Sequence, residues 1–203
     1  MPFIVALHHQ VHPGRREKRV DTVRADFATS PMSHPGRKFA RLFLYLYDQT
    51  RLLAIEEWES RDLFDRHEQS PSYVDTLATS GPTPRIDVLE RLQHYRHMPH
   101  SPAALACTAI SSPADRADEI EEFICDEERR ETLVAAGLVL RAVDGVVGDA
   151  GRLLVLHGWR SMDDLERYLS GSAPTTASML ASFGATFDQF AGTLAAEYSW
   201  LGT

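Results

Sequence analysis

The sequence has few cysteines, fewer basic than acidic residues and no long apolar run, and each shortage excludes a class of protein. Its two cysteines, Cys107 and Cys125, are too few for a disulfide framework and lack the spacing of a zinc or redox site. A formal net charge of −8 disfavours nucleic-acid binding, which needs a basic surface. No apolar stretch approaches the ~20 residues of a membrane-spanning helix, and the first residues lack the basic region of a signal peptide. We therefore expect a cytoplasmic protein without nucleic-acid or membrane partners.

The most informative feature of the sequence is an internal repeat. Residues 51–62 (RLLAIEEWESRD) align without a gap on residues 152–163 (RLLVLHGWRSMD), an offset of 101 residues. Solenoid repeats have periods of ~20–50 residues, so this longer offset indicates duplication of a whole domain. A chain of 203 residues is long enough for two small domains.

Both copies show the same order of predicted elements. In the first copy, strands are expected over residues 2–12, 39–47, 51–58 and 85–95, with helices over 15–28 and after Ser60. In the second copy, strands are expected over residues 103–110, 138–143, 152–159 and 188–199, with helices after Ser112 and Ser161. The order β-α-β-β-α-β is that of a ferredoxin-like domain, whose helices cover one face of an antiparallel sheet.

The predicted hairpin of the first copy is apolar or aromatic on both faces, so the sheet needs two coverings. Helices supply one covering, and the sheet of the other copy can supply the second. We therefore predict an α+β fold of two tandem ferredoxin-like domains, at residues 1–99 and 102–203. Their antiparallel sheets are expected to pack together as an intramolecular α/β barrel.

Three motifs of the first copy resemble the antibiotic biosynthesis monooxygenase (ABM) family of dimeric α/β-barrel proteins. They are a first strand ending in HPG at 12–14, the pattern IEEWES at 55–60 leading into a helix, and Ser70-Pro71. The resemblance implies two fused ABM-like domains and an oxygenase in secondary metabolism. The implied partners are O₂ and a polycyclic aromatic, polyketide-type intermediate, with no tightly bound cofactor. Reduced flavin as a diffusible co-substrate is the first alternative, and a non-catalytic ligand-binding or cyclisation-assisting protein is the second.

The resemblance also implies that Trp58 forms an aromatic wall of the pocket. In anthrone-oxidising members of the family, an Asn four residues before this Trp and a Tyr six residues after it line the site. In this chain those positions hold Ala54 and Phe64. By strand alternation, Glu56 shares a face with Trp58 and needs a buried partner.

Histidines are the candidate bases, and eight of the nine lie in the first half of the chain, at or before residue 100. Since the first strand of a ferredoxin-like sheet lies between the third and the fourth, His9, Glu56 and His94 are expected to be lateral neighbours. A Glu56–His9 pair could be an orienting group and a general base, or a structural polar network. The predicted catalytic residues are His9, His67 and Trp58. The predicted substrate-binding residues are Leu7, Tyr45, Ala54, Glu56, Phe64, Tyr73 and His94.

Two further types of site are disfavoured. No predicted helix carries two histidines at the spacing of metal ligands, so no metal is expected. The positions that the resemblance assigns to haem degradation hold Leu7, His67 and Leu77 instead of the family's residues. The second copy is poorer in polar groups and is expected to be structural, and pairing of the whole chain as a homodimer stays open.

Overall fold

The computed structural model describes residues 3–12, 14–71, 73–74, 81–96 and 102–199. Leu77 and most of the predicted linker lie outside these ranges. The chain divides into two compact units, which we call unit 1 (Met1–Leu89 with Leu194–Thr203) and unit 2 (Glu90–Thr193). Two strands, β4 (Arg85–Arg96) and β8 (Thr186–Ser199), therefore contribute to both units.

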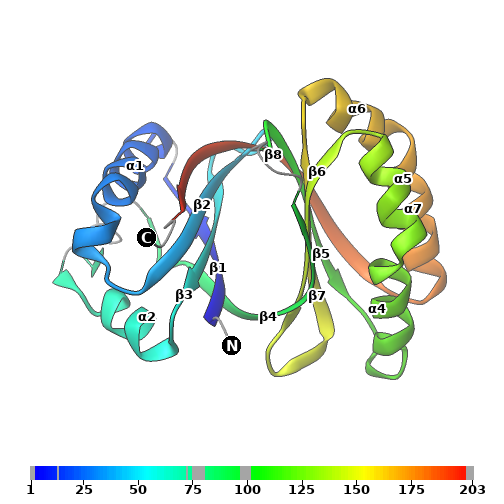
Figure 1. Ribbon diagram of the computed structural model, residues 1–203, viewed down its shortest axis with the longest axis horizontal. Coiled ribbons are helices and arrows are strands. Elements are labelled where there is room, and N and C mark those ends of the chain that lie inside the picture. Colours follow the sequence, from blue (N-terminus) through cyan, green and yellow to red (C-terminus); the bar gives the residue numbers. More distant parts are fainter. Residues whose placement is uncertain (1–2, 13, 72, 75–80, 97–101, 200–203) are drawn as a thin grey trace. The chain divides into compact units, whose positions relative to one another are not determined.

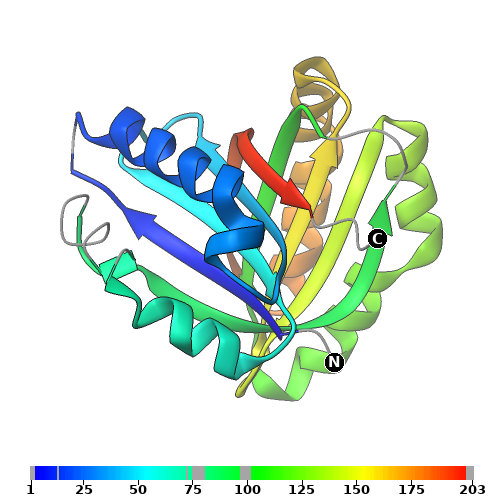
Figure 2. The same cartoon turned by 60° about the vertical axis from the view of Figure 1, so that its left-hand side comes forward.

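Unit 1 has the element order of a ferredoxin-like domain. It consists of β1 (Phe3–Gln10), α1 (Arg16–Ser33), β2 (Arg37–Tyr45), β3 (Arg51–Trp58), α2 (Arg61–Glu68) and the first part of β4 (Figure 1). β1 pairs with both β3 and β4, and β2 pairs with the other edge of β3, all antiparallel. α1 and α2 lie on the same side of these strands (Figure 2).

Local signals explain where the helices of unit 1 begin and end. The hydroxyl of Ser60 accepts a hydrogen bond from the Leu63 amide and caps α2, as the sequence indicates. α1 continues to Ser33, five residues beyond the end of the helix predicted over residues 15–28. Gly36 adopts a left-handed φ of 91° in the turn that follows, a conformation that glycine tolerates best. The longer helix places His34 at its C-terminal end, where the side chain is buried rather than in an exposed loop.

Unit 2 repeats this order with a larger helical layer. Its elements are β5 (Ala104–Ser111), η1 (Ala114–Arg116), α4 (Ala117–Cys125), α5 (Glu127–Ala135), β6 (Leu138–Val146), β7 (Asp149–Trp159), α6 (Met162–Ser170), α7 (Ser172–Ser182) and parts of β4 and β8. The helices α4 to α7 lie together on one side of β5, β6 and β7 (Figure 1). Ser161 caps α6 just as Ser60 caps α2, which confirms that the aligned segments occupy equivalent places.

The hydrogen-bonded strand order, β1-β3-β2-β8-β5-β7-β6-β4, closes on itself as a barrel. The predicted fold class is therefore confirmed. Strands of unit 1 are buried on both faces, as their composition predicted. Leu42 and Ala54 pack under the helices in the core of the unit, while Leu53 and Phe43 on the opposite face are equally buried. No helix of the described residues is both long and apolar enough to cross a membrane.

The end of β8 is joined to unit 1 by an ion pair that can be tested. The buried guanidinium of Arg41 donates to the carboxylate of Glu197 at 2.6 and 2.8 Å. Replacement of Glu197 by Ala removes the acceptor but leaves the cation buried. We expect the free energy of unfolding in urea to fall by about 2 kcal/mol, less than for a fully buried pair because Glu197 is partly exposed. The control Glu122→Ala, on the exposed surface of α4, should change it by less than ~0.5 kcal/mol; equal losses would contradict this role.

Candidate functional site

A cavity of about 70 Å³ lies in unit 1 between the strands β1 and β3 and the helices α1 and α2. Together with its mouth, which opens to solvent, the space measures about 530 Å³. Six of the predicted site residues line it: Leu7, His9, Ala54, Glu56, His67 and Tyr73. Arg19 and Asp26 of α1, which the sequence did not single out, complete its polar wall.

Two predicted residues lie directly behind this wall. Trp58 is fully buried and donates from Nε1 to Oε2 of Glu56 at 2.9 Å. Its ring centroid lies 5.0 Å from that of His67 and 5.9 Å from that of Phe64. Phe64 packs in turn on Phe3. Trp58 therefore positions two residues that line the cavity, Glu56 and His67, and Phe64 packs against Trp58.

Tyr45 and His94 are not part of this cavity. Tyr45 belongs to the alternating set of β2 that faces away from α1 and α2, and its hydroxyl accepts a hydrogen bond from Arg51. His94 lies beyond Leu89 on β4, in the part of that strand that belongs to unit 2. Both were predicted to bind substrate. Strand alternation tells which residues share a face, but the face that lines the cavity is known only once the strand is placed in the sheet.

The predicted lateral neighbours are also separated by strand register. His9 is opposite Leu52 and Glu56 is opposite Val5, so the two side chains are four positions apart along β1, roughly 13 Å. β4 pairs with β1 only from Arg85 to Leu89. The prediction of a Glu56–His9–His94 row, and of a Glu56–His9 pair, is therefore wrong. The prediction that Glu56 shares the helix-facing side with Trp58 is confirmed by their hydrogen bond.

Glu56 has a cationic partner that the sequence did not reveal. Nη1 of Arg37 lies 3.4 Å from Oε1 of Glu56, and Nη2 of Arg37 donates to Asp26 at 2.7 Å. The side chain of Arg37 is only 1% exposed, so this cation depends on both carboxylates. Burial raises the pKa of Glu56, while the charge of Arg37 and the hydrogen bond from Trp58 oppose the rise.

Asp26 also begins a chain of hydrogen bonds that reaches the cavity through two imidazoles. Its Oδ1 is bonded to Nε2 of His34, and Nδ1 of His34 lies 3.0 Å from Nδ1 of His67. Although burial opposes the change, the hydrogen bond from His34 and the charge of Arg37 lower the pKa of Asp26 to about 2. Burial, with smaller contributions from His34 and Arg37, lowers the pKa of His67 to about 3. At neutral pH an ionised carboxylate therefore lies at one end of this relay and a neutral imidazole at the other.

His9 has a different partner and hence a different chemical state. Nη2 of Arg19 lies 3.3 Å from Nδ1 of His9. Because a guanidinium can only donate, Nδ1 accepts and the proton of neutral His9 resides on Nε2. Burial, followed by the charges of Arg19 and His8, lowers the pKa of His9 to about 3. The acceptor nitrogen of His9 is thus already used, so this histidine is suited to orient Arg19.

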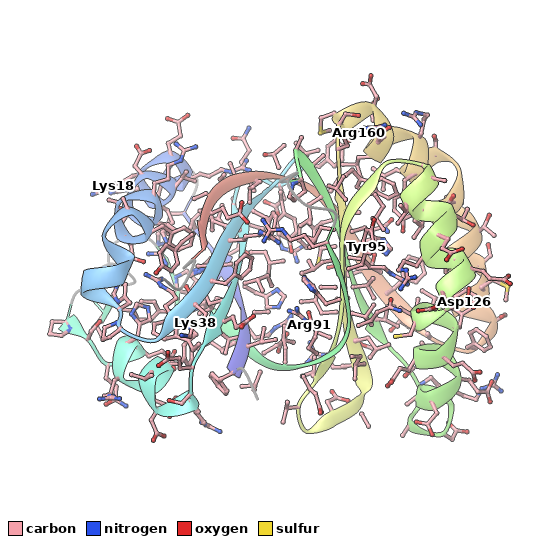
Figure 3. All side chains as sticks on the ribbon, in the orientation of Figure 1. Lys18, Lys38, Arg91, Tyr95, Asp126 and Arg160 are labelled. Carbon is pink, nitrogen blue, oxygen red and sulfur yellow. The ribbon has the colours of Figure 1, made fainter. Side chains whose placement is uncertain are left out.

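Sequence reasoning missed four ionisable residues of this site: Arg19, Asp26, His34 and Arg37. Arg19 follows Lys18, which points outward from α1 (Figure 3), and the two look equivalent in a charged helix. Only the packing of the helix on the sheet buries one and exposes the other. The spacing of Arg19, Val23 and Asp26 along one helix face was an available signal. His34 and Arg37 gave no such signal, because both lie beyond the helix predicted over residues 15–28.

The equivalent place in unit 2 holds a different set of side chains. Trp159 occupies the position of Trp58, and Tyr168, 101 residues after His67, stacks on it at 4.8 Å. His157 replaces Glu56, and burial followed by the charges of Arg141 and Arg129 lowers its pKa to about 3. Within the ranges that the structure describes, neither unit holds a group of three or more His, Cys, Asp or Glu side chains that could bind a metal ion.

Comparison with known proteins connects this fold to a family. Residues 2–79 match the family model described as antibiotic biosynthesis monooxygenase. No curated protein matches the sequence. A proposed monooxygenase of Lactobacillus acidophilus NCFM is 7% identical with a TM-score of 0.74, and covers 98% of this chain and 96% of its own. A proposed monooxygenase of Fusobacterium nucleatum subsp. nucleatum ATCC 25586 is 10% identical with a TM-score of 0.77, and the match covers 100% of this chain and 96% of that one. An anthrone oxidase-like protein is 11% identical with a TM-score of 0.75, and the match covers 98% of this chain and 92% of that one.

The fold and the barrel define the class, an α+β protein of two ferredoxin-like halves joined in one chain. Residues 2–79 match the ABM family model, as the sequence resemblance predicted. The solved structures share the architecture over nearly the whole chain, and at these identities they show the fold alone. The family match ends before the second copy, and the residues that line the cavity all lie in the matched segment.

The buried histidines predict how stability depends on pH. The pKa of each of His9, His67 and His157 is lowered to about 3 from about 6.5 in an unfolded chain. Between these values the unfolded state binds protons that the folded state does not, so stability should fall as the pH decreases from about 6.5 towards 3. Each histidine contributes up to about 1.4 kcal/mol per pH unit.

Urea unfolding between pH 7 and 4.5 measures this slope. His157→Leu should remove one histidine's share and flatten the curve. His12→Leu, at an exposed position, is the matched control and should leave it unchanged. A slope that is the same in all three proteins would show that these imidazoles are not buried in the neutral form.

Proposed function

We propose that this protein is an O₂-dependent monooxygenase that acts on a polycyclic aromatic, polyketide-type compound at the cavity of unit 1, without a tightly bound metal. The observation that carries the proposal is the Asp26–His34–His67 relay, which ends in a neutral imidazole at the cavity. The ABM domain supplies the reaction class. In this proposal unit 2 completes the fold and has no reaction of its own.

The relay gives His67 the form of a general base. The carboxylate of Asp26 can only accept, so Nε2 of His34 donates to it. In neutral His34, Nδ1 then accepts the proton of His67 Nδ1, and Nε2 of His67 is left as the basic nitrogen. This is the nitrogen that His34 does not engage, on a ring that lines the cavity.

The relay also explains how an imidazole with a pKa of about 3 can take up a proton. When Nε2 of His67 accepts a proton, Nδ1 can pass its own to His34. The positive charge then resides on His34, where it is hydrogen-bonded to ionised Asp26. The proton taken up at the cavity is therefore passed along the relay rather than held by His67 alone.

Such a base can start oxygenation of an electron-rich ring system. Removal of a proton from a methylene group activated by flanking phenolic rings leaves a carbanion, which transfers an electron to O₂. Recombination gives a peroxide, which collapses to a ketone and water. The substrate supplies all four electrons, one oxygen atom enters it and the other leaves as water. In this proposal the cavity of about 70 Å³ takes O₂ and the reacting edge, and the remaining rings extend through its open mouth.

O₂ uptake with a simple hydroxylated anthrone, without added cofactor, tests this function. The wild-type rate should exceed autoxidation, and His67→Gln should lower kcat by about 10²–10⁴-fold because the base is lost. Tyr168→Phe, the equivalent position of unit 2, is the matched control and should keep full activity. Activity that survives in His67→Gln would remove this residue from the mechanism.

The relay predicts a second, smaller effect. His34→Gln keeps a hydrogen-bonding group beside His67 but cannot carry the relayed proton. We expect kcat to fall about 10–100-fold while KM changes less than threefold, with a shifted pH–kcat profile. An unchanged pH profile would reduce His34 to a structural role.

Two other results would favour the alternative functions. If uptake requires reduced flavin, flavin is a diffusible co-substrate of the same site. If the anthrone binds but no uptake follows under either condition, a ligand-binding or cyclisation-assisting role takes the place of the oxygenase.

A further inference from the structure

The cavity contains hydrogen-bond donors for which the described residues offer no acceptor. Nε and Nη1 of Arg19 are buried without a hydrogen-bond partner, and so is the hydroxyl of Tyr73. Both residues line the cavity, and Arg19 is only 3% exposed. An unpaired donor at such a place is unfavourable, and a buried guanidinium especially so. Three donor atoms in one cavity therefore point to a missing acceptor.

The two carboxylates of the cavity do not fill this role. Asp26 binds His34 and Arg37, and Glu56 binds Arg37 and Trp58. Their charges act on Arg19 from a distance, but the hydrogen bond that Arg19 makes within the cavity is to Nδ1 of His9. That bond uses Nη2 and fixes the orientation of the guanidinium, with Nε and Nη1 left for another acceptor.

We propose that Arg19 and Tyr73 form an oxyanion-binding subsite, and that the ligand of this cavity is an aromatic molecule carrying an ionised oxygen. The surroundings fit such a molecule. Leu7, Ala54 and Phe27 supply apolar contacts along the cavity, and the ring of His67 lies 4.6 Å from that of Tyr73. A carboxylate and a phenolate share this chemistry, since each is a planar group that presents a negatively charged oxygen to a guanidinium.

The inference deepens the proposed function, because it names the class of substrate, but it does not depend on turnover. In the oxygenase, the subsite would hold the oxygen of the deprotonated substrate while the His67 relay holds the proton. In a binding protein, the same subsite would hold the same oxygen without reaction. Binding measured under anaerobic conditions separates the subsite from the oxygenase.

Titration calorimetry with three matched ligands tests the subsite. Wild-type protein should bind 2-naphthoate at least ~10-fold more tightly than 2-naphthamide, which has the same rings but no charge. With 2-naphthol, the absorption spectrum of the bound ligand should be that of the naphtholate ion if the subsite takes phenolates. A naphthoate preference alone identifies the carboxylate as the ligand class.

Variants of Arg19 should abolish the preference for the anion. Arg19→Met removes the donors while retaining the unbranched chain, and its melting temperature should be unchanged or higher because an unpaired buried cation is removed. If Arg19→Met does not fold, Arg19→Gln is used in its place and should also lose the preference. Arg24→Met is the matched control, on the exposed flank of the same helix, and should keep the preference. Tyr73→Phe should lose it in part.

The proposal is overturned if wild-type protein binds naphthoate and naphthamide equally, if it binds neither naphthoate nor naphtholate, or if the preference survives in Arg19→Met. Anion binding that requires Arg19 in a protein without O₂ uptake would support the subsite and contradict the oxygenase. O₂ uptake by a protein that shows no preference for the anion would support the oxygenase and contradict the subsite.

Discussion

The candidate site depends on one buried cation, the guanidinium of Arg37. It lies on β2 and contacts a carboxylate on α1 (Asp26) and another on β3 (Glu56), so a single side chain ties the helix to two strands. A cation with 1% exposure is stable only while both partners are in place. Each partner in turn fixes another group: Asp26 holds the imidazole of His34, and Glu56 accepts from Trp58. The cavity can therefore persist beside a well-packed core, because hydrogen-bond geometry holds its polar wall open.

The duplication within the chain shows what this cation contributes. Arg37 is opposite Trp58 in the β2–β3 ladder, and Leu138 is opposite Trp159 in the β6–β7 ladder, so the two copies have the same register at this point. With Leu138 in place of Arg37 and Tyr168 in place of His67, the tryptophan stacks on a phenol ring. The tryptophan is thus shared by the two copies, while the residues around it differ.

The sequence was sufficient for most of the fold and for part of the site. The repeat at an offset of 101 residues, together with hairpin alternation, placed β3 at its observed bounds and gave the order of elements in both copies. It could not give register, which depends on how antiparallel strands slide past one another; for this reason the expected Glu56–His9–His94 row was wrong. Nor could it separate Arg19 from Lys18, because burial of one face of a charged helix is decided by the sheet beneath it.

The groups that propensity and patterning explain least well are those that the proposed chemistry needs most. Arg19 and Tyr73 hold buried donors without acceptors, and His67 is a neutral imidazole far from its ordinary pKa. A fold optimised for stability alone would have apolar side chains at these three positions. The second copy has such a replacement at another buried position, where Leu138 stands in place of Arg37. Local rules tend to be broken at functional sites and satisfied elsewhere. Unit 2 also buries unpaired polar atoms, at Arg141 and His157, so the reason to place the reaction in unit 1 is that its exceptions line a cavity within the segment that matches the ABM family model.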